Sequence, residues 1–441
     1  MYAGREVVTT GIPGADPFTM AGHAQPWVDQ QWLAHAAYYL SWRAGGYPGV
    51  VLLCALVVTA GFALLFALLR SRGGTPVTCS LWTLAALLAC LSSVTPRAQV
   101  FAFPLFAGVL WWLLSDRSPR RWQRWLVVPS VALWGNLHGS VLLGVALVVA
   151  QCSWDAIREV RRGRLTEAAM QVCLLLATVA ATLVNPYGSQ IWTYYRGVLG
   201  SDAISRQVSE WQPLDLGDPN QLPLLCLVLA STAVVVWSIM RRRPVRLGLL
   251  LLALLTLALV LRSGRQEMWV AMVLAVLVID TGANRGVAPA GGRPAALHAV
   301  LAASVVLAGV ATGLVLTSSA ADFEAALPRG AVAVAAKQLR AAPDATLLGD
   351  EAATLLLWRA PLSSGRVGYD IRYEIYPSAA LRSYFDFLDA RTPAWHRLAA
   401  DYDLVLVSKQ VHPELANAVS TSADWSVVYA DGEGVVAKRR S

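Results

Sequence analysis

A polar segment near the start of the chain holds the acidic side chains best suited to chemistry. Asp16 lies in an Asp-Pro-Phe-Thr stretch, and Asp29 lies in the segment that leads into Gln31 and Trp32. Carboxylates of this kind serve in general acid–base chemistry. We interpret the segment as the roof of a site, with Asp16 and Asp29 as candidate catalytic residues and Gln31 and Trp32 as candidate substrate-binding residues. An aromatic anchor at the membrane surface is the alternative for Trp32.

Three arginines have the right character to hold a phosphate. Arg97 follows a proline in a short loop, and Arg262 and Arg265 are three positions apart in another loop. The planar guanidinium group matches phosphate oxygens with two parallel hydrogen bonds. Two structural alternatives stay open: Arg97 as a snorkelling side chain, and the other two arginines as partners of Glu267 or Glu210.

The remaining candidate binding residues lie in short motifs between apolar runs. They are Asn136 and His138 in Trp-Gly-Asn-Leu-His-Gly, Asn185 and Tyr187 in Asn-Pro-Tyr-Gly, and Glu210 and Trp211 in Ser-Glu-Trp-Gln-Pro. Arginine-containing loops flank the first motif on both sides, so the chain must turn near it, and irregular backbone at membrane depth requires a cavity. A hydrogen-bonded structural histidine is an equally weighted alternative there. The Asn-Pro-Tyr-Gly motif is a good helix stop and a weaker chemical signal.

The elements that must position these residues are apolar. The 441 residues are 56% hydrophobic and 15% charged, with a mean hydropathy of +0.50. Apolar runs near the length of a membrane span predict a polytopic α-helical membrane protein. About ten spans are expected, roughly at 49–69, 77–94, 98–114, 122–135, 138–154, 166–184, 222–240, 246–261, 267–281 and 296–317. Ten crossings put both ends outside, so we expect an eleventh helix upstream of Met1.

The net charge of +8 is explained by the membrane topology and does not indicate a nucleic-acid partner. Sixteen arginines cluster in alternate loops, near residues 70–72, 117–124, 158–164, 241–246 and 285–293, against seven in the other loops and the N-terminal segment. The arginine-rich loops are therefore predicted to be cytoplasmic. The six cysteines lie in or beside apolar runs without metal-binding spacing, so they are expected to be small core residues.

The composition changes after the last span. We expect three regions: a first outer loop at 1–48, a transmembrane helical domain at 49–320, and a soluble α/β domain at 321–441. In the last region helices near 330–342, 351–358, 378–390 and 412–420 alternate with short apolar strands, which predicts a mainly parallel sheet. Asp370 and Arg372 follow one of these strands, where a structural ion pair is favoured over a ligand site. No glycine-rich phosphate loop is present.

Taken in order, these motifs resemble the bacterial GT-C superfamily of integral-membrane glycosyltransferases, in particular an actinobacterial-type branch with an extracytoplasmic C-terminal domain. The segments that carry the resemblance are 11–18, 26–33, 96–97, 134–139, 185–188, 210–211 and 370–376. The resemblance implies a polyprenyl-phosphate sugar donor, an acid in the first outer loop as general base, and cations that hold the lipid phosphate. Asp16 matches that acid, and Gln31 stands where a glutamate is expected.

The expected function is therefore inverting transfer of a hexosyl or pentosyl group from a polyprenyl-phosphate-linked sugar to a cell-envelope glycan, lipid or protein. The protein is expected to be a multi-pass plasma-membrane protein in contact with membrane lipids, with its C-terminal domain extracytoplasmic. A requirement for a divalent cation stays open. The alternatives are a non-catalytic membrane scaffold and a lipid-carrier transporter. A transporter would place its charged residues in mid-membrane on broken helices, whereas here the polar groups gather at one face.

Overall fold

A computed structural model describes the chain in two compact units. The described residues are 1–23, 25–114, 121–200, 212–215, 217–282, 317, 323–324, 327–390 and 394–440. The first unit comprises Met1–Arg43, Gln190–Gln207 and Ser318–Ser441. The second comprises Ala44–Ser189 and Val208–Thr317.

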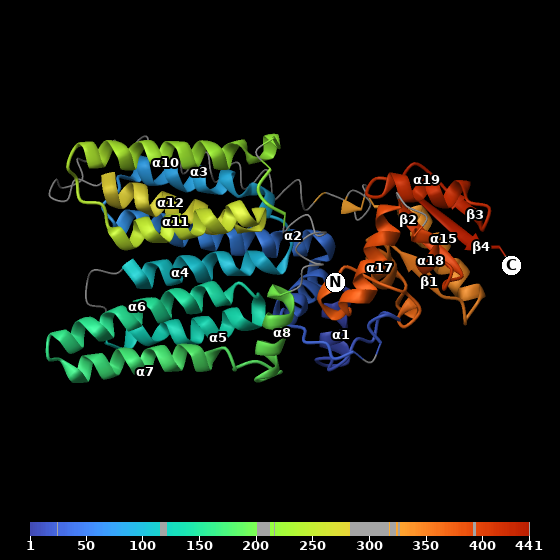
Figure 1. The fold of residues 1–441 in the computed structure, drawn as a ribbon, viewed down its shortest axis with the longest axis horizontal. Helices are drawn as coiled ribbons and strands as arrows, with labels where there is room; N and C mark the ends of the chain where they lie inside the picture. Colours follow the sequence, from blue (N-terminus) through green and yellow to red (C-terminus); the bar gives the residue numbers. More distant parts are fainter. Residues whose placement is uncertain are drawn as a thin grey trace. The chain divides into compact units, whose positions relative to one another are not determined.

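The second unit is a bundle of apolar helices (Figure 1). After α2 (Trp32–Ser71), its helices are α3 (Pro76–Ala89), α4 (Ala102–Leu114), α5 (Val127–Leu137), α6 (Val141–Arg161), α7 (Leu165–Ala181), α10 (Leu222–Met240), α11 (Leu247–Arg262) and α12 (Glu267–Gly282). Short 3-10 turns connect some of them, at Leu91–Ser93, Ala98–Phe101, Arg121–Leu126, Pro219–Gln221 and Gly264–Gln266. A helix overlaps each of the first nine predicted apolar runs. The tenth run, 296–317, lies outside the described residues except for Thr317.

Three of the described helices are long and apolar enough to cross a membrane: Trp32–Ser71, Val141–Arg161 and Pro219–Met240. Four shorter apolar helices accompany them, at Pro76–Ala89, Ala98–Leu114, Leu165–Ala181 and Leu247–Arg262. The longest helix is interrupted at Gly45 and Gly46, whose backbone angles are not helical. Gly46 has a φ of +62°, a left-handed conformation that glycine adopts without the steric cost of a side chain.

Helix α12 is the core of the helical unit. Every residue from Glu267 to Thr281 is buried, and the helix packs against α3, α10 and α11. Its charged ends have different partners. Asp280 near the C-terminus accepts a hydrogen bond from Arg72 Nε at 2.9 Å and lies 3.3 Å from Arg246 Nε. Glu267 at the N-terminus accepts a hydrogen bond from Ser92. Thirteen residues of helix separate the two acids by about 20 Å.

The first unit contains a mixed four-stranded sheet. Its strands are β1 (Leu347–Gly349), β2 (Leu404–Ser408), β3 (Trp425–Ala430) and β4 (Gly434–Arg439), in the order β1-β2-β4-β3. Only β1 and β2 pair in parallel, and the other two pairings are antiparallel. The expectation of a mainly parallel sheet was wrong because it missed β4. The Asp431 carboxylate accepts hydrogen bonds from the backbone of Glu433 and Gly434, which turns the chain from β3 directly into that strand.

The helices predicted for the C-terminal region are confirmed. They are α15 (Arg329–Ala341), α16 (Ala352–Arg359), α17 (Ser378–Asp389) and α19 (Pro413–Thr421), joined by the short α18 (Trp395–Ala399). Of these, α15, α16 and α19 pack on the sheet. The unit also includes α1 (Tyr2–Thr9) and α8 (Gln190–Leu199).

The N-terminal segment is part of the same α/β unit. Met20 N donates a hydrogen bond to Val367 O at 2.7 Å, and Gly365 N donates one to Phe18 O at 2.7 Å. Val367 in turn forms a bridge with Leu347 of β1. Backbone pairing therefore extends the sheet edge into the polar segment that contains Asp16.

Candidate functional site

Asp16 lies inside the α/β unit with its carboxylate fully engaged. The residue is 2% exposed. One carboxylate oxygen accepts a hydrogen bond from Phe18 N at 3.0 Å, and the other accepts from Thr19 N at 3.1 Å and from the Thr19 hydroxyl. This is the local turn that an aspartate before proline favours, in which the side chain binds the backbone two or three positions further on. The turn fixes the direction of the Asp16 carboxylate.

Arg372 completes the surroundings of Asp16. Its Nη2 donates to Asp16 Oδ1 at 2.8 Å and to Asp370 Oδ2 at 2.6 Å, and its Nε donates to Asp370 Oδ2 at 2.8 Å. The predicted structural pair of Asp370 and Arg372 is thus confirmed. Burial alone would lower the pKa of Arg372, but the carboxylate of Asp370, followed by the Tyr2 hydroxyl and the Asp16 carboxylate, raises it well above its ordinary value. The guanidinium therefore stays charged.

Aromatic rings and two tyrosine hydroxyls surround this ion cluster. The Arg372 guanidinium carbon lies 4.4 Å from the Trp27 ring centre and 4.8 Å from that of Phe18. Tyr2 and Tyr376 each donate a hydrogen bond to Asp370 at 2.9 Å. Burial, followed by the charge of Asp370, raises the pKa of both tyrosines, so their hydroxyls remain protonated donors. The cluster joins the N-terminal segment to the C-terminal region, and a role for Asp16 as general base remains a prediction.

Asp29 is paired with a histidine that was not among the predicted site residues. His35 Nδ1 lies 2.9 Å from Asp29 Oδ1 and 3.0 Å from Oδ2. Asp29 is buried, whereas the His35 side chain is 27% exposed. A carboxylate that orients a partly exposed imidazole is a common general-base arrangement. The sequence held a signal for this pair: Asp29 lies at the end of the loop just before α2, and His35, six positions later, lies in the first turns of that helix. Gln31 and Trp32, both half-buried, lie between them.

In the helical unit, Arg265, His138 and Gln99 come together from three different connections. Arg265 Nε donates to Gln99 Oε1 at 3.1 Å, and Gln99 Nε2 donates back to Arg265 O at 2.9 Å. Arg265 Nη2 lies 3.2 Å from His138 Nε2. Gln99 and His138 are buried, and Arg265 is half-buried. Two of the predicted binding residues, Arg265 and His138, therefore lie in contact. Gln99 was missed, although its position two residues after Arg97 in the same loop was the available signal.

Neighbouring groups hold this cluster, which we call the Arg265 cluster, in place. His138 ends α5, and its Nδ1 lies 2.7 Å from the Ser140 hydroxyl. Trp134 Nε1 donates to the same hydroxyl at 3.0 Å. A guanidinium group fixed by an amide and an imidazole is suited to hold an anionic oxygen.

The other predicted binding residues have separate places. Asn136 donates hydrogen bonds to Ala132 O at 2.8 Å and Val184 O at 2.7 Å, which ties α5 to the end of α7. The Asn185 side chain accepts from Tyr187 N at 2.8 Å, as in a turn. Arg97 and Arg262 are exposed at the ends of their elements. Glu210 and Trp211 lie outside the described residues.

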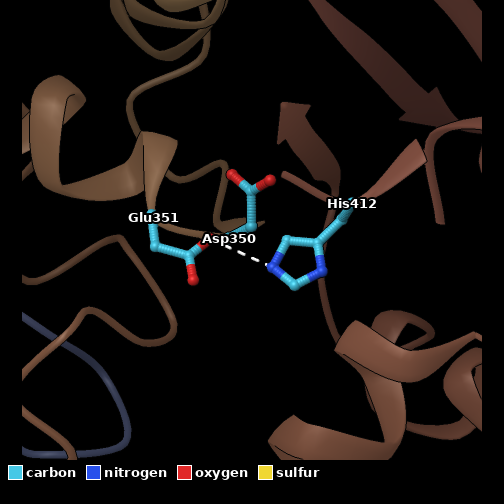
Figure 2. Close-up of side chains that lie close together, drawn as sticks. All are labelled: Asp350, Glu351 and His412. Atoms are coloured by element: carbon cyan, nitrogen blue, oxygen red, sulfur yellow. Dashed lines mark hydrogen bonds and ion pairs between the residues drawn. The ribbon is translucent and has the colours of Figure 1, made fainter. Parts of the chain in front are cut away.

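A cavity and a group of ligating side chains lie in the α/β unit away from these residues. The cavity, of about 470 Å³, is lined by Arg329, Arg340 and Arg359 among others, and by none of the predicted site residues. Within the described part of the chain, the side chains that could hold a metal ion are those of Asp350, Glu351 and His412 (Figure 2).

The apolar helices and the small mixed sheet define the class: a helical membrane protein with an attached α/β unit. No protein-family model matches the sequence, and no curated protein matches it. Two similar solved structures are of ArnT from Cupriavidus metallidurans. The one bound to undecaprenyl phosphate has 15% identity and a TM-score of 0.48. The apo state has 17% identity and a TM-score of 0.45. Each match covers 99% of this chain and 92% of the other.

With TM-scores below 0.5, the likeness by itself assigns neither a fold nor an activity to this chain.

Proposed function

We propose that the protein is a membrane glycosyltransferase that moves a sugar from a polyprenyl-phosphate donor to an extracytoplasmic cell-envelope acceptor. The observation that carries this proposal is the Arg265 cluster at the ends of apolar helices. When the sugar–phosphate bond breaks, negative charge grows on the phosphate oxygens. Donors that are already in position stabilise that charge without the cost of reorganisation. Arg265, held by Gln99 and close to His138, supplies such donors.

The surface beside the cluster suits a lipid-linked substrate. Arg265 follows α11, on which Leu251, Leu254 and Leu261 are each more than half exposed. An exposed run of leucines on a helix of this kind packs against hydrocarbon. A polyprenyl chain could therefore lie along the helix while its phosphate reaches the loop after it.

The distribution of charge supports an extracytoplasmic position for the cluster. Arg265 lies two residues before the start of α12. Two arginines from arginine-rich loops, Arg72 and Arg246, meet Asp280 at the other end of that helix. Arginine-rich loops of membrane proteins are cytoplasmic. The opposite end, where Arg265 lies, then faces outward.

A base must take the proton of the acceptor hydroxyl as its oxygen forms the new bond to the sugar. In an inverting reaction the attack and the departure of polyprenyl phosphate occur on opposite faces of the sugar carbon. Two carboxylates of the first unit are candidates: Asp16, which matches the general base of the resembled family, and Asp29, whose partner His35 is partly exposed. The His35 pair is the better placed to receive a proton from solvent-accessible substrate.

Photo-crosslinking tests phosphate capture directly. A polyprenyl phosphate with a diazirine near its phosphate is added to the full chain in lipid nanodiscs, and labelled peptides are identified by mass spectrometry. We expect labelling of the peptide around Arg265, competition by unlabelled polyprenyl phosphate, and loss of labelling in Arg265→Ala but not in Arg196→Ala. Equal labelling of both variants would overturn the assignment.

One observation favours a second candidate function, a non-catalytic membrane scaffold. Asp16 is buried and bound to Arg372, as in a structural ion pair. In that case Asp16→Asn would leave the biological function intact. A loss of sugar transfer in a folded Asp16→Asn protein would exclude the scaffold.

A further inference from the structure

We propose that Asp350, Glu351 and His412 form a binding site for a divalent transition-metal ion in the α/β unit, with Zn²⁺ as the ion of choice (Figure 2). One ligand atom from each residue lies within 4.8 Å of those of the other two. The site is separate from the residues proposed for sugar transfer and does not depend on that function.

The three residues occupy a favourable place in the sheet. Asp350 and Glu351 directly follow Gly349, the last residue of β1. His412 follows β2, and its backbone N donates to Ser408 O, the last residue of that strand, at 3.0 Å. Since β1 and β2 are parallel neighbours, their carboxyl ends lie at the same edge of the sheet. Ligands of α/β folds bind at this edge.

The donor atoms have nearly the spacing that a metal requires. Tetrahedral Zn²⁺ with ligands at about 2.0–2.1 Å keeps neighbouring ligand atoms about 3.3 Å apart. Glu351 Oε2 and His412 Nε2 are 3.0 Å apart, and the largest separation in the group is within 4.8 Å. Small side-chain rotations are therefore sufficient to close the site. Asp350 is fully buried, whereas Glu351 and His412 are half-buried, so an ion can enter from their side.

Outer hydrogen bonds already orient the ligands. Asp350 Oδ1 accepts from Ala352 N at 2.9 Å and Oδ2 accepts from Ser408 N at 2.6 Å. Each carboxylate oxygen can accept more than one bond, so both retain capacity for a metal. Such supporting bonds are typical of metal ligands and raise metal affinity.

An ion pair between Glu351 and His412 alone explains the positions of these three side chains less well than a metal site does. It leaves the second carboxylate, Asp350, which is fully buried next to the first, with two backbone hydrogen bonds and, among the described residues, no cation of its own. A divalent cation would compensate both carboxylates at once. One imidazole with two carboxylates suits Zn²⁺ better than Mg²⁺ or Ca²⁺, which prefer oxygen ligands alone.

Zn²⁺ titration of the untagged full chain in nanodiscs tests the site. Binding is measured by competition with a fluorescent zinc chelator, and the melting temperature is recorded with and without the ion. We expect one saturable site and a rise in melting temperature. His412→Ala should weaken this binding at least tenfold and abolish the rise. Glu351→Gln, which keeps the shape of the side chain, should weaken binding without unfolding the protein.

His396→Ala is the matched control, because His396 also pairs with a carboxylate, that of Asp424 at 3.4 Å, but without a third ligand in the described residues. It should bind Zn²⁺ like the unmodified protein. The proposal is overturned if the unmodified chain shows no saturable site. It is equally overturned if His412→Ala and Glu351→Gln bind Zn²⁺ as tightly as His396→Ala. Neither readout involves sugar transfer, so the outcome is independent of the proposed enzymatic function.

Discussion

Arg372 Nη2 donates a hydrogen bond to Asp16 Oδ1 at 2.8 Å, although the two residues are 356 positions apart in the chain. Arg372 also binds Asp370, so one guanidinium serves two buried carboxylates. This contact makes the polar N-terminal segment and the C-terminal region parts of one folded unit. It also gives Asp16 a role in stability that is separate from the general-base role proposed for it.

The stability role predicts that Arg372→Met is much more damaging than Asp16→Asn. Arg372→Met leaves two buried carboxylates without a cation, which should lower the free energy of unfolding by about 3–5 kcal/mol. Asp16→Asn leaves the Arg372 and Asp370 pair intact and should cost less. Thermal unfolding in nanodiscs measures both, with Arg382→Met on the exposed face of α17 as control. Similar losses from Arg372→Met and Arg382→Met would contradict the structural role.

Gly22 should not tolerate a side chain. A Cβ at this position would meet the Asp16 carboxylate, and it would lie 2.8 Å from Thr19 Oγ1 and 2.9 Å from Ile375 Cδ1. Overpacking of this kind costs about 1–3 kcal/mol, so Gly22→Ala should melt at a lower temperature. Gly14→Ala is the control, because a Cβ there meets nothing within 4 Å. Equal melting temperatures for the two variants would show that the turn around Asp16 is not rigid.

If the His35 pair supplies the base, Asp29→Asn and His35→Gln should each slow sugar transfer by about 10²–10⁴-fold, the usual contribution of a positioned general base. Melting temperatures and donor binding should change little. His23→Ala, which removes an exposed histidine of the same segment, is the control and should transfer at the unmodified rate. A normal rate in both Asp29→Asn and His35→Gln would leave Asp16 as the base.

Loss of the Arg265 guanidinium should weaken donor binding. A hydrogen bond to a charged group contributes about 1.5–3 kcal/mol, so Arg265→Ala should raise the Kd for polyprenyl phosphate roughly 10–100-fold. Arg97→Ala should weaken binding as well if that arginine shares the phosphate. Equilibrium binding of a fluorescent polyprenyl phosphate to nanodiscs gives both values, and Arg196→Ala should be unaffected. Unchanged affinity in Arg265→Ala would remove phosphate capture from this loop.

Glu374 should make stability depend on pH. Burial raises the pKa of Glu374 above its ordinary value of 4.5. The folded state therefore holds the proton more tightly than the unfolded state. The resulting stabilisation is present below pH 4.5 and is lost as the pH rises through the raised pKa. Glu374→Gln should then be more stable than the unmodified protein at pH 7.5, with the difference shrinking toward pH 4. Melting curves at both pH values check this, and a constant difference would contradict it.

Patterns within short stretches of sequence were sufficient to predict much of the fold. Apolar runs predicted the helices because length and composition alone decide whether a segment can cross a membrane. The pair of Asp370 and Arg372 was also accessible, since the two residues are only two positions apart. By contrast, β4 has only three apolar residues after Gly434, Val435 to Ala437, and ends in Lys438 and Arg439, so its apolar signal is weak. Without that strand the sheet was wrongly expected to be mainly parallel.

The candidate site was harder to predict from the sequence because it depends on contacts between residues that are far apart in the chain. Nothing in the Asp-Pro-Phe-Thr stretch indicates that Asp16 meets Arg372, which lies in the C-terminal region. Arg265 and His138 were each identified from their loops, but Gln99, which orients the guanidinium, resembles any other polar loop residue. Such partners become visible only when the packing of the helices brings three loops together.

A transfer assay with the purified full chain in nanodiscs tests the proposed sugar transfer directly. Polyprenyl-phosphate-linked sugars are supplied with cell-envelope acceptors, and mass spectrometry follows the release of polyprenyl phosphate together with the glycosylated product. We expect equal amounts of both products with at least one donor, and almost none with Arg265→Ala. The absence of transfer from every donor by folded protein that binds polyprenyl phosphate would contradict it.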